Sequence, residues 1–297
     1  MHKLGAVLRL TRVEHSAMLA IAVLAAEQLA GGLPGIGTLV LSLIAPVLVS
    51  MASFAINDYF DIKVDKLNKK NRPLVTGELK PVQALYISAA AFTAGIAASA
   101  AINTYAFVIV VVFTALAVLY SYRLKEMLLL GNVYIALTMV IPFIFGSYVV
   151  GNTLGTGIAL ICAMIFASGL GREIHGSIRD FGGDTKVRNV VSLPRVIGLR
   201  GSAAVSLALY LVAIAISAYL FLFVRPFAFN TIFGAVVLAS DALLLYVSLG
   251  YVRKTGKSER QRRTSARFFD RARDLSLLAM GLALLAILAS AFLSFYI

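Results

Sequence analysis

Charged residues are scarce in this chain, since only 14% of its 297 residues are Asp, Glu, Lys or Arg and 60% are hydrophobic. A mean hydropathy of +0.89 excludes an ordinary soluble domain. The single cysteine, Cys162, excludes an intrachain disulfide, and its place in an apolar run is typical of a small buried side chain. Residues 1–14 are short and basic, and no small-residue cleavage site follows them, so we expect no removable targeting segment.

Long apolar runs account for most of the remaining sequence. A bilayer is crossed by a helix of about 20 apolar residues, and the chain contains nine runs of this kind. Their expected bounds are 15–31, 36–58, 81–101, 104–121, 131–150, 154–173, 201–223, 227–250 and 275–296. The sequence therefore predicts an all-α integral membrane protein with nine transmembrane helices.

Basic residues gather between alternate spans. Only Arg225 lies apart from them, and the other 26 of 27 Lys and Arg residues fall in segments 1–14, 59–80, 122–130, 172–200 and 251–274. The positive-inside rule predicts that these segments are cytosolic, with the N-terminus in the cytosol and the C-terminus outside the cell membrane. Because topology explains the net charge of +13, we expect membrane lipid and not nucleic acid as a partner.

Two long polar segments, 59–80 and 174–200, follow the second and the sixth span, and each is associated with a cluster of acidic residues. Four spans separate the two clusters. This spacing predicts two four-helix halves in the same orientation plus a ninth helix. We expect one transmembrane domain over residues 1–297, capped by loops from the two polar segments.

The first acidic cluster has the spacing of a helix face. Asn57, Asp61 and Asp65 recur every four residues, and Asp58 adjoins them. On a helix the three lie within about 80° of one another. Oxygen-only side chains favour a hard cation such as Mg²⁺, which commonly bridges carboxylates to substrate phosphates. The absence of His and Cys from the cluster argues against zinc.

The second acidic cluster consists of Glu173, Asp180 and Asp184, which lie within about 40° of one another if a helix continues through Gly182 and Gly183. A single cluster could simply balance neighbouring Lys and Arg. Carboxylates at a membrane boundary are costly to desolvate, however, so two clusters in equivalent places favour a built site. The residues that we predict to bind metal are Asn57, Asp58, Asp61, Asp65, Asp180 and Asp184.

Cations beside both clusters suit a phosphorylated ligand, because Arg and Lys stabilise a metal-held diphosphate as it leaves. The alternative is that these residues are topology signals facing anionic lipid, and we favour that alternative for the segment 251–274. The residues that we predict to bind a donor diphosphate or an acceptor phosphate are Lys66, Arg72, Arg123, Lys125, Arg179 and Lys186.

Four further polar residues stand apart from the clusters. We expect His15 and His175 to be polar interface residues and not ligands, because each is isolated. Glu27 lies in the first span and Asp241 in the eighth. An acid inside a span is a functional candidate by default, although the sequence names no partner for either.

These motifs resemble those of the UbiA superfamily of intramembrane prenyltransferases. The family's first motif, N-D-x-x-D-x-x-x-D, is matched at residues 57–65 and continues into Asn-Arg-Pro-Leu at 71–74. The second motif, D-x-x-x-D with a preceding acid, is similar to residues 173–184. A motif that runs from Tyr to Lys is similar to residues 120–125. The resemblance covers nearly the whole chain.

The resemblance implies nine helices that enclose a central apolar chamber open to lipid, and transfer of an isoprenoid chain from a diphosphate donor with Mg²⁺ as cofactor. The metal-bound diphosphate leaves, an allylic carbocation develops, and an acceptor attacks it. Glu173, Lys125 and Tyr122 are then expected to be catalytic. A weak base suffices for a late proton transfer, and Glu173 is the expected proton acceptor.

Within the family, residues 173–184 followed by Ser-Leu-Pro at 192–194 are most similar to archaeal digeranylgeranylglyceryl phosphate synthases. This implies transfer of a geranylgeranyl chain from geranylgeranyl diphosphate to the hydroxyl of geranylgeranylglyceryl phosphate in archaeal ether-lipid biosynthesis. His-Gly-Ser at 175–177 departs from the charged residues expected there. An aromatic acceptor of quinone biosynthesis, of the 4-hydroxybenzoate or naphthoate type, is therefore the alternative. A transporter is disfavoured, because both clusters fall at one membrane edge and not at the midplane.

Overall fold

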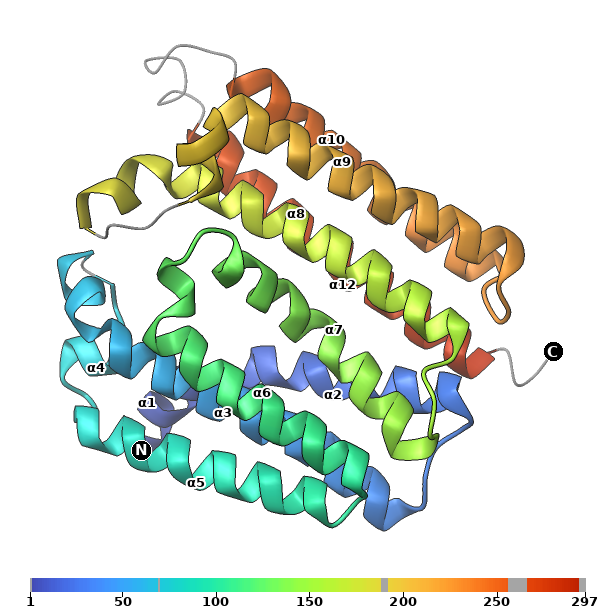
Figure 1. The fold of residues 1–297 in the computed structure, drawn as a ribbon, viewed down its shortest axis with the longest axis horizontal. Helices are drawn as coiled ribbons and strands as arrows, with labels where there is room; N and C mark the ends of the chain where they lie inside the picture. Colours follow the sequence, from blue (N-terminus) through green and yellow to red (C-terminus); the bar gives the residue numbers. More distant parts are fainter. Residues whose placement is uncertain (1, 69, 188–191, 256–265, 294–297) are drawn as a thin grey trace. The chain divides into compact units, whose positions relative to one another are not determined.

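The computed structural model describes residues 2–68, 70–187, 192–255 and 266–293. Within these ranges every regular element is helical, and nine helices are long and apolar enough to span a membrane, as predicted (Figure 1). They are α2 (Val13–Ala30), α3 (Ile36–Leu67), α5 (Pro81–Ala100), α6 (Thr104–Tyr122), α7 (Leu130–Val150), α8 (Thr156–Val187), α9 (Leu193–Phe223), α10 (Thr231–Thr255) and α12 (Ala266–Leu293). The shorter elements are α1 (His2–Thr11), α4 (Pro73–Thr76) and a 3₁₀ turn at Leu124–Glu126.

Two segments predicted as cytosolic loops, 59–80 and 174–200, are helical over much of their length, which corrects that prediction. Helix α3 runs on to Leu67 and helix α8 to Val187. A helix pairs its backbone N–H and C=O groups internally, so a lengthened span carries polar side chains out of the bilayer without unpaired backbone. Gly182 and Gly183 do not interrupt α8, although each glycine weakens a helix by about 0.5–1 kcal/mol. Each acidic cluster therefore starts from a rigid helix.

The chain forms two compact units, and unit 1 comprises Met1–Lys125 and Pro142–Leu154. Helix α3 is central in unit 1, where it packs against α1, α2, α5 and α6. Small residues allow close approach of neighbouring spans. A Cβ atom on Gly146 of α7 would lie 2.8 Å from the carbonyl oxygen of Val23 in α2. Glycine at this position therefore sets the distance between these two helices.

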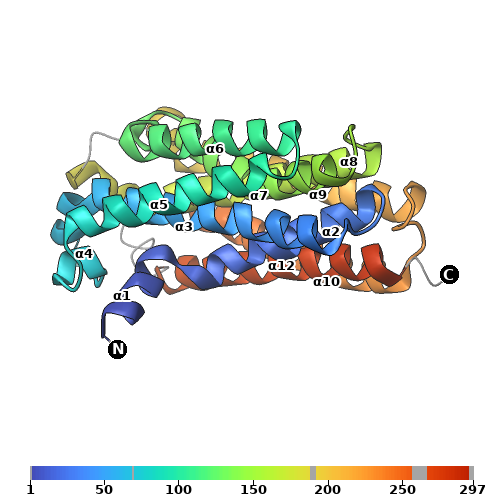
Figure 2. The ribbon, with the colours of Figure 1, turned by 90° about the horizontal axis from the view of Figure 1, so that it is seen from below.

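The short helices α1 and α4 lie beside the C-terminal part of α3 (Figure 2). A small apolar core joins the three helices, and its buried members include Ala6 and Leu10 of α1, Ala55 of α3 and Leu74 of α4. The buried face of α1 thus covers the segment that follows the first acidic cluster. That segment carries Arg72, which directly precedes α4.

Unit 2 comprises Glu126–Ile141 and Gly155–Ile297. Helix α8 packs against α9, and α10 packs against both α9 and α12. Its core contains Ile174 and Ile178 of α8, Tyr251 of α10 and Phe269 of α12. The hydroxyl of Ser206 in α9 also donates a 2.8 Å hydrogen bond to the carbonyl of Gly171 in α8. Helix α8 is therefore held by apolar packing and by a buried polar contact.

Unit 1 contains the four spans of the predicted first half, whereas unit 2 includes the ninth helix, which was predicted to stand apart from both halves. The first four spans belong to unit 1 and the last four to unit 2, whereas α7 is divided between the units at Ile141 and Pro142. Helix α7 itself is continuous through Pro142, so the division reflects which neighbouring helices each part of α7 contacts. Helix α9 is kinked at Gly198, whose φ of 75° lies outside the helical region. The predicted span beginning at 201 therefore corresponds to the part of α9 after the kink.

Candidate active site

The first acidic cluster lies near the C-terminal end of α3 and is buried. The exposed fractions of Asp58, Asp61 and Asp65 are 3%, 9% and 1%. Helical spacing brings their side chains toward one side of α3, because positions 58 and 65 differ by almost two full turns. A buried carboxylate without a partner is strongly destabilising, so each of these acids needs cations or hydrogen-bond donors close to it.

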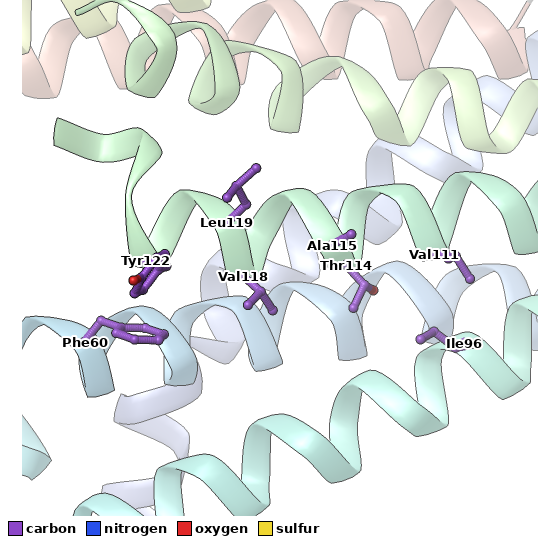
Figure 3. A pocket seen from close by; sticks show the side chains of 8 residues that line it. All are labelled: Phe60, Ile96, Val111, Thr114, Ala115, Val118, Leu119 and Tyr122. Atoms are coloured by element: carbon purple, nitrogen blue, oxygen red, sulfur yellow. The ribbon is translucent and has the colours of Figure 1, made fainter. Parts of the chain in front are cut away.

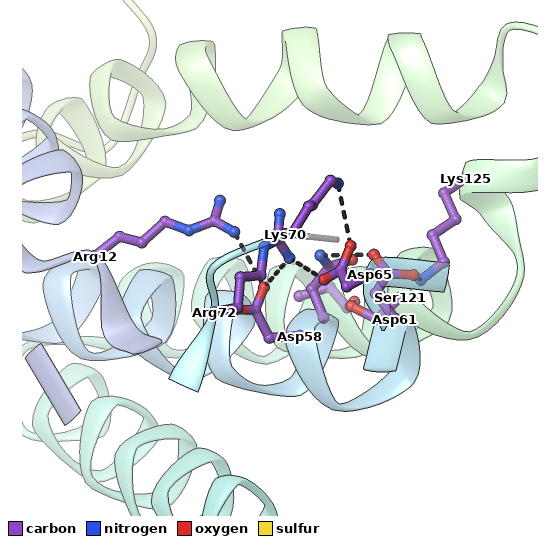
Figure 4. A network of polar contacts seen from close by, with 10 residues as sticks. Arg12, Asp58, Asp61, Asp65, Lys70, Arg72, Ser121 and Lys125 are labelled. Atoms are coloured by element: carbon purple, nitrogen blue, oxygen red, sulfur yellow. Dashed lines mark hydrogen bonds and ion pairs between the residues drawn. The ribbon is translucent and has the colours of Figure 1, made fainter. Parts of the chain in front are cut away.

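Arginine and lysine side chains supply these partners for Asp58 and Asp65 (Figure 4). The Asp58 Oδ1 atom accepts a 3.0 Å hydrogen bond from Arg12 and a 2.5 Å hydrogen bond from Arg72. Arg72 also lies 2.7 Å from Asp65 Oδ2, while Lys70 Nζ lies 3.1 Å from Asp65 Oδ1. Arg72, the residue that precedes α4, therefore bridges two carboxylates of α3.

The third aspartate pairs with a residue that follows α6. Lys125 Nζ donates a 2.6 Å hydrogen bond to Asp61 Oδ1, and Asn57 Nδ2 donates a 3.2 Å hydrogen bond to Asp61 Oδ2. The 3₁₀ turn at Leu124–Glu126 brings Lys125 to this position. The structure therefore brings the first acidic cluster and the end of the Tyr-to-Lys segment together.

Taken together, these contacts set three carboxylates, on Asp58, Asp61 and Asp65, against four cationic side chains, on Arg12, Lys70, Arg72 and Lys125. The described network thus carries one surplus positive charge. Such a site attracts an anionic ligand, whose phosphate oxygens its cations can bind.

Two members of this network, Arg12 and Lys70, were not predicted from the sequence. Arg12 is 46 residues from Asp58 in the chain, and no motif singles it out. Burial lowers the pKa of its guanidinium, and the charge of Asp58 opposes that effect. Arginine is the most basic side chain in proteins, so Arg12 stays charged at neutral pH. Only the docking of the N-terminal helix reveals its place in the site.

Three predicted site residues of unit 1 lie outside this buried network. Lys66 and Arg123 are exposed, in contrast to the buried aspartates. Tyr122 is 64% exposed, and its ring meets that of Phe60 edge-on with the centroids 5.9 Å apart. Tyr122 therefore makes its described contact with an aromatic side chain next to Asp61 in the sequence and not with the aspartates.

An apolar groove of about 640 Å³ begins at this aromatic pair (Figure 3). It is formed by one residue of α3, one of α5 and six of α6, and its lining residues are Phe60, Ile96, Val111, Thr114, Ala115, Val118, Leu119 and Tyr122. The hydroxyl oxygen of Thr114 is buried and has no hydrogen-bond partner among the described residues. The groove is therefore suited to an apolar chain.

The second acidic cluster has a different set of contacts. Glu173 pairs with the adjacent Arg172 at 3.0 Å, and Asp180 forms two hydrogen bonds of 2.7 and 2.9 Å with the adjacent Arg179. Because α8 is continuous from Glu173 to Asp180, the two acids lie on the same helix face, as the sequence predicts for an unbroken helix. The predicted residues Asp184 and Lys186 have side chains that lie outside the described residues.

His175 is a core residue of unit 2 and not an interface residue. Its exposed fraction is 4%, and its ring stacks on Tyr251 with centroids 3.7 Å apart and an interplanar angle of 3°. Neither ring nitrogen has a hydrogen-bond partner within the described part of the chain. His175 lies 200° from Glu173 around α8, so it faces away from the second acidic cluster.

Two membrane acids lie apart from both clusters. Glu27 of α2 is fully buried, and Ser42 of α3, which lies nearby, donates its own hydrogen bond to the carbonyl of Leu39. Asp241 of α10 accepts a 2.6 Å hydrogen bond from Ser217 of α9. Each acid thus has a serine on a neighbouring helix of its own unit.

The donor atoms of the first acidic cluster fit Mg²⁺, provided that substrate oxygens and water complete its coordination shell. Asn57 Oδ1 is buried without a hydrogen-bond partner among the described residues, and the aspartates offer only oxygen. Across those same residues, no three His, Cys, Asp or Glu side chains converge closely enough to hold a metal by themselves. A metal here would complete its shell with substrate oxygens and water, as Mg²⁺ commonly does.

Known proteins are similar to this chain over most of its length. The model of the UbiA prenyltransferase family matches residues 17–272. A digeranylgeranylglyceryl phosphate synthase of Archaeoglobus fulgidus is 36% identical over 86% of this chain and 84% of its own length. The corresponding protein of Pyrococcus abyssi is 30% identical over 78% and 81%. Both alignments span most of each protein.

Solved structures show the same fold. One, from work on digeranylgeranylglyceryl phosphate synthase in membranes, has a TM-score of 0.77 at 25% identity, with 98% of this chain and 99% of that chain covered. A UbiA homolog from Archaeoglobus fulgidus, bound to DMAPP and Mg²⁺, has a TM-score of 0.65 at 22% identity, with 95% and 99% covered. The resemblance found in the sequence is confirmed, and the chain belongs to the UbiA prenyltransferase family.

Proposed function

We propose that this intramembrane prenyltransferase moves a geranylgeranyl chain from geranylgeranyl diphosphate to the hydroxyl of geranylgeranylglyceryl phosphate, in the biosynthesis of archaeal ether lipids. The names of relatives that are 30–36% identical over most of the chain support this acceptor. The observation that carries the proposal is the buried first acidic cluster, where four cations face three carboxylates on one helix. Such a site suits a metal-held diphosphate.

The Mg²⁺ ions, when bound, neutralise the diphosphate and make it a better leaving group. The residues proposed to hold them are Asn57, Asp61, Asp65, Asp180 and Asp184. Asp58 was predicted with them, but two arginines on one of its oxygen atoms favour a different role, that of holding these arginines in place.

The cations of the first acidic cluster have a proposed part in the departure of diphosphate. Lys125 and Arg72 are now within 2.6 and 2.7 Å of Asp61 and Asp65. As a ligand with phosphate oxygens enters, these two cationic groups can turn from the carboxylate oxygens to the phosphate oxygens without moving far. Hydrogen bonds between charged groups are strong, and they strengthen further as negative charge collects on the leaving oxygen.

The second acidic cluster is proposed to serve the acceptor. The bond between C1 of the donor chain and its diphosphate oxygen breaks, and the glycerol oxygen forms a bond to C1. The hydroxyl proton then passes to Glu173, whose carboxylate pairs only with its neighbour Arg172 in the described contacts. A late proton transfer of this kind needs only a weak base. Arg179 and Lys186 are proposed to anchor the acceptor phosphate.

We further propose that both units act as one prenyltransferase domain over residues 1–297, because each unit supplies one acidic cluster. The chain is a multi-pass membrane protein, and we propose that its N-terminus is cytosolic and its C-terminus external. Single cysteines replacing Asn68 and Asn152, in a Cys162→Ala background, should react with an impermeant thiol reagent from opposite sides. Reaction from the same side would overturn this orientation.

An acceptor panel tests the proposed reaction directly. Purified protein is incubated with labelled geranylgeranyl diphosphate, Mg²⁺ and either geranylgeranylglyceryl phosphate or 4-hydroxybenzoate at equal concentrations. We expect faster turnover with the glycerol phosphate, and EDTA should abolish it. Faster turnover of 4-hydroxybenzoate would overturn the proposed acceptor and assign the enzyme to quinone biosynthesis.

A further inference from the structure

We propose that Arg12 is a positioning residue for the first acidic cluster, acting through Asp58 to hold Arg72 against Asp65; this rests on the proposed role of that cluster in donor binding. Arg12 joins α1 to α2 and belongs to none of the three family motifs found in the sequence. Its side chain nevertheless reaches the acidic face of α3 (Figure 4).

Arg12 and Arg72 share one oxygen atom. Both guanidinium groups donate to Asp58 Oδ1, Arg12 at 3.0 Å and Arg72 at 2.5 Å, and the exposed fraction of Asp58 is only 3%. Two guanidinium groups therefore occupy the Oδ1 atom of Asp58, and only its Oδ2 atom is left for a further ligand. We therefore assign Asp58 to the holding of arginines and leave the metal to its neighbours on α3.

The consequence for Arg72 follows from its second contact. Its Nη1 atom lies between Asp58 Oδ1 and Asp65 Oδ2, which is 2.7 Å away. With Arg12 present, Asp58 is already partly neutralised and Arg72 is shared between the two acids. Without Arg12, the full charge of Asp58 would draw Arg72 away from Asp65. Arg12 thus sets how Arg72, a residue predicted to bind the diphosphate, is shared between Asp58 and Asp65.

The backbone at Arg12 is built for this contact. Arg12 has φ 46° and ψ 54°, a left-handed conformation that side chains with a Cβ atom disfavour. Such a conformation persists where the surrounding structure fixes it, which is common at functional sites. Here the Arg12 carbonyl accepts hydrogen bonds from the first turn of α2, at His15 and Ser16, and its guanidinium lies 4.6 Å from the ring centre of Phe54.

Helix α1, which precedes Arg12, is itself held against its neighbours. Ala6 and Leu10 are fully buried against α3 and α4, whereas the ion pair of Arg9 with Glu78 joins two exposed side chains and adds little to this packing. Because α4 begins directly after Arg72, α1 covers the segment that carries this arginine (Figure 2). The N-terminal helix therefore positions Arg12 and Arg72 together.

The first test replaces Arg12 with alanine in the full chain and titrates geranylgeranyl diphosphate and Mg²⁺ by calorimetry, with no acceptor present. Loss of a residue that orients metal or phosphate ligands typically lowers affinity about 10-fold or more, and we expect a shift of that size in Mg²⁺-dependent donor binding. Arg9→Ala is the matched control, since it breaks the other ion pair around α1 without touching Asp58, and it should bind as the unchanged protein does.

A double-mutant cycle separates positioning from general damage. Asp58→Asn should impair donor binding as Arg12→Ala does, and the double variant should be no more than about twofold worse than the weaker-binding single variant, because both act through one contact. Arg12→Lys should restore binding only in part, since lysine lacks the planar guanidinium. Unchanged donor and Mg²⁺ binding in Arg12→Ala, or fully additive losses in the double variant, would overturn the proposal. Because no acceptor is used, failure of the proposed acceptor would leave this result unaffected.

Discussion

The carboxylates of the two acidic clusters are neutralised by cations that come from different parts of the chain. In the first, the carboxylates of α3 are paired with cations that lie 14, 46 and 64 residues away in the chain. In the second, Glu173 and Asp180 are paired with the residues that directly precede them. Asp65 is 1% exposed, whereas the side chain of Asp180 is 47% exposed.

This difference bears on preorganisation. Partners brought from α1, from the segment before α4 and from the turn after α6 fix the first cluster through the tertiary fold, before any ligand arrives. Neighbouring arginines on α8 impose no such constraint, because residues adjacent in the chain stay close together whatever the tertiary fold. We infer that the first cluster is a preset diphosphate site, whereas the second can change its partners as substrate binds.

Removing Arg72 should give the largest effect, because it leaves two buried carboxylates short of a cation. Breaking a buried ion pair costs about 3–5 kcal/mol, so Arg72→Ala should lower the free energy of unfolding by about 3 kcal/mol or more. The measurement is denaturant unfolding in detergent micelles. Arg273→Ala is the control, since the pair of Arg273 with Asp274 is more than half exposed on both sides. Similar stability of the two variants would contradict the contrast between buried and exposed pairs.

Asp61→Asn should give the next largest effect, and it acts on activity. The change preserves shape but removes a charge that pairs with Lys125 at 2.6 Å and that we assign to the metal site. By analogy with other lost electrostatic contacts in active sites, kcat should fall about 10²-fold. Initial rates with saturating donor and Mg²⁺ measure this, with Asp274→Asn as the surface control. A rate within twofold of the unchanged protein would remove Asp61 from the site.

Arg179→Ala should have a much smaller effect on stability. Its partner Asp180 is almost half exposed, and ion pairs of this kind are worth about 0–1 kcal/mol. We expect a loss below about 1 kcal/mol in the same unfolding measurement, together with a raised KM for the acceptor and a nearly unchanged KM for the donor. A stability loss as large as that of Arg72→Ala would show that the two clusters are held alike.

The smallest expected effect is that of salt on the coupling energies of the ion pairs in the two clusters. Raising the ionic strength from 0.1 to 1 M shortens the Debye length from about 10 Å to about 3 Å, which screens exposed pairs far more than buried ones. The coupling between Arg179 and Asp180, measured by a double-mutant cycle, should therefore fall by a few tenths of a kcal/mol. The coupling between Arg72 and Asp65 should stay constant, and an equal fall in both would contradict their different burial.

The fold was predictable where composition decides it. A span is set by the local supply of apolar residues, so the nine helices and most of their bounds follow from the sequence. The helical extensions to Leu67 and Val187 were not predicted, because polar residues at a helix end look like loop residues until their backbone is seen. The division of α7 at Pro142 depends on contacts between helices, and those are not readable from local sequence.

The site was predictable to the extent that its residues lie close together in the chain. Asp58, Asp61 and Asp65 could be placed on one face of α3 by periodicity alone. Arg12 could not be linked to them, because its contact with Asp58 depends on how α1 docks onto α3. The burial of His175 between aromatic residues of α9 and α10 was missed for the same reason.

The buried Glu27 has a consequence for how the chain enters the membrane during synthesis. Helix α2 has the lowest mean hydropathy of the nine spans, 1.2 against 2.4 for α3, and it carries this acid near its end. An acid at the centre of a span opposes release from the translocon into lipid by about 2.5–3.5 kcal/mol, and by less toward the ends. Helix α2 alone is therefore a weak insertion signal. We therefore expect α2 to partition into lipid together with the strongly apolar α3, as one hairpin.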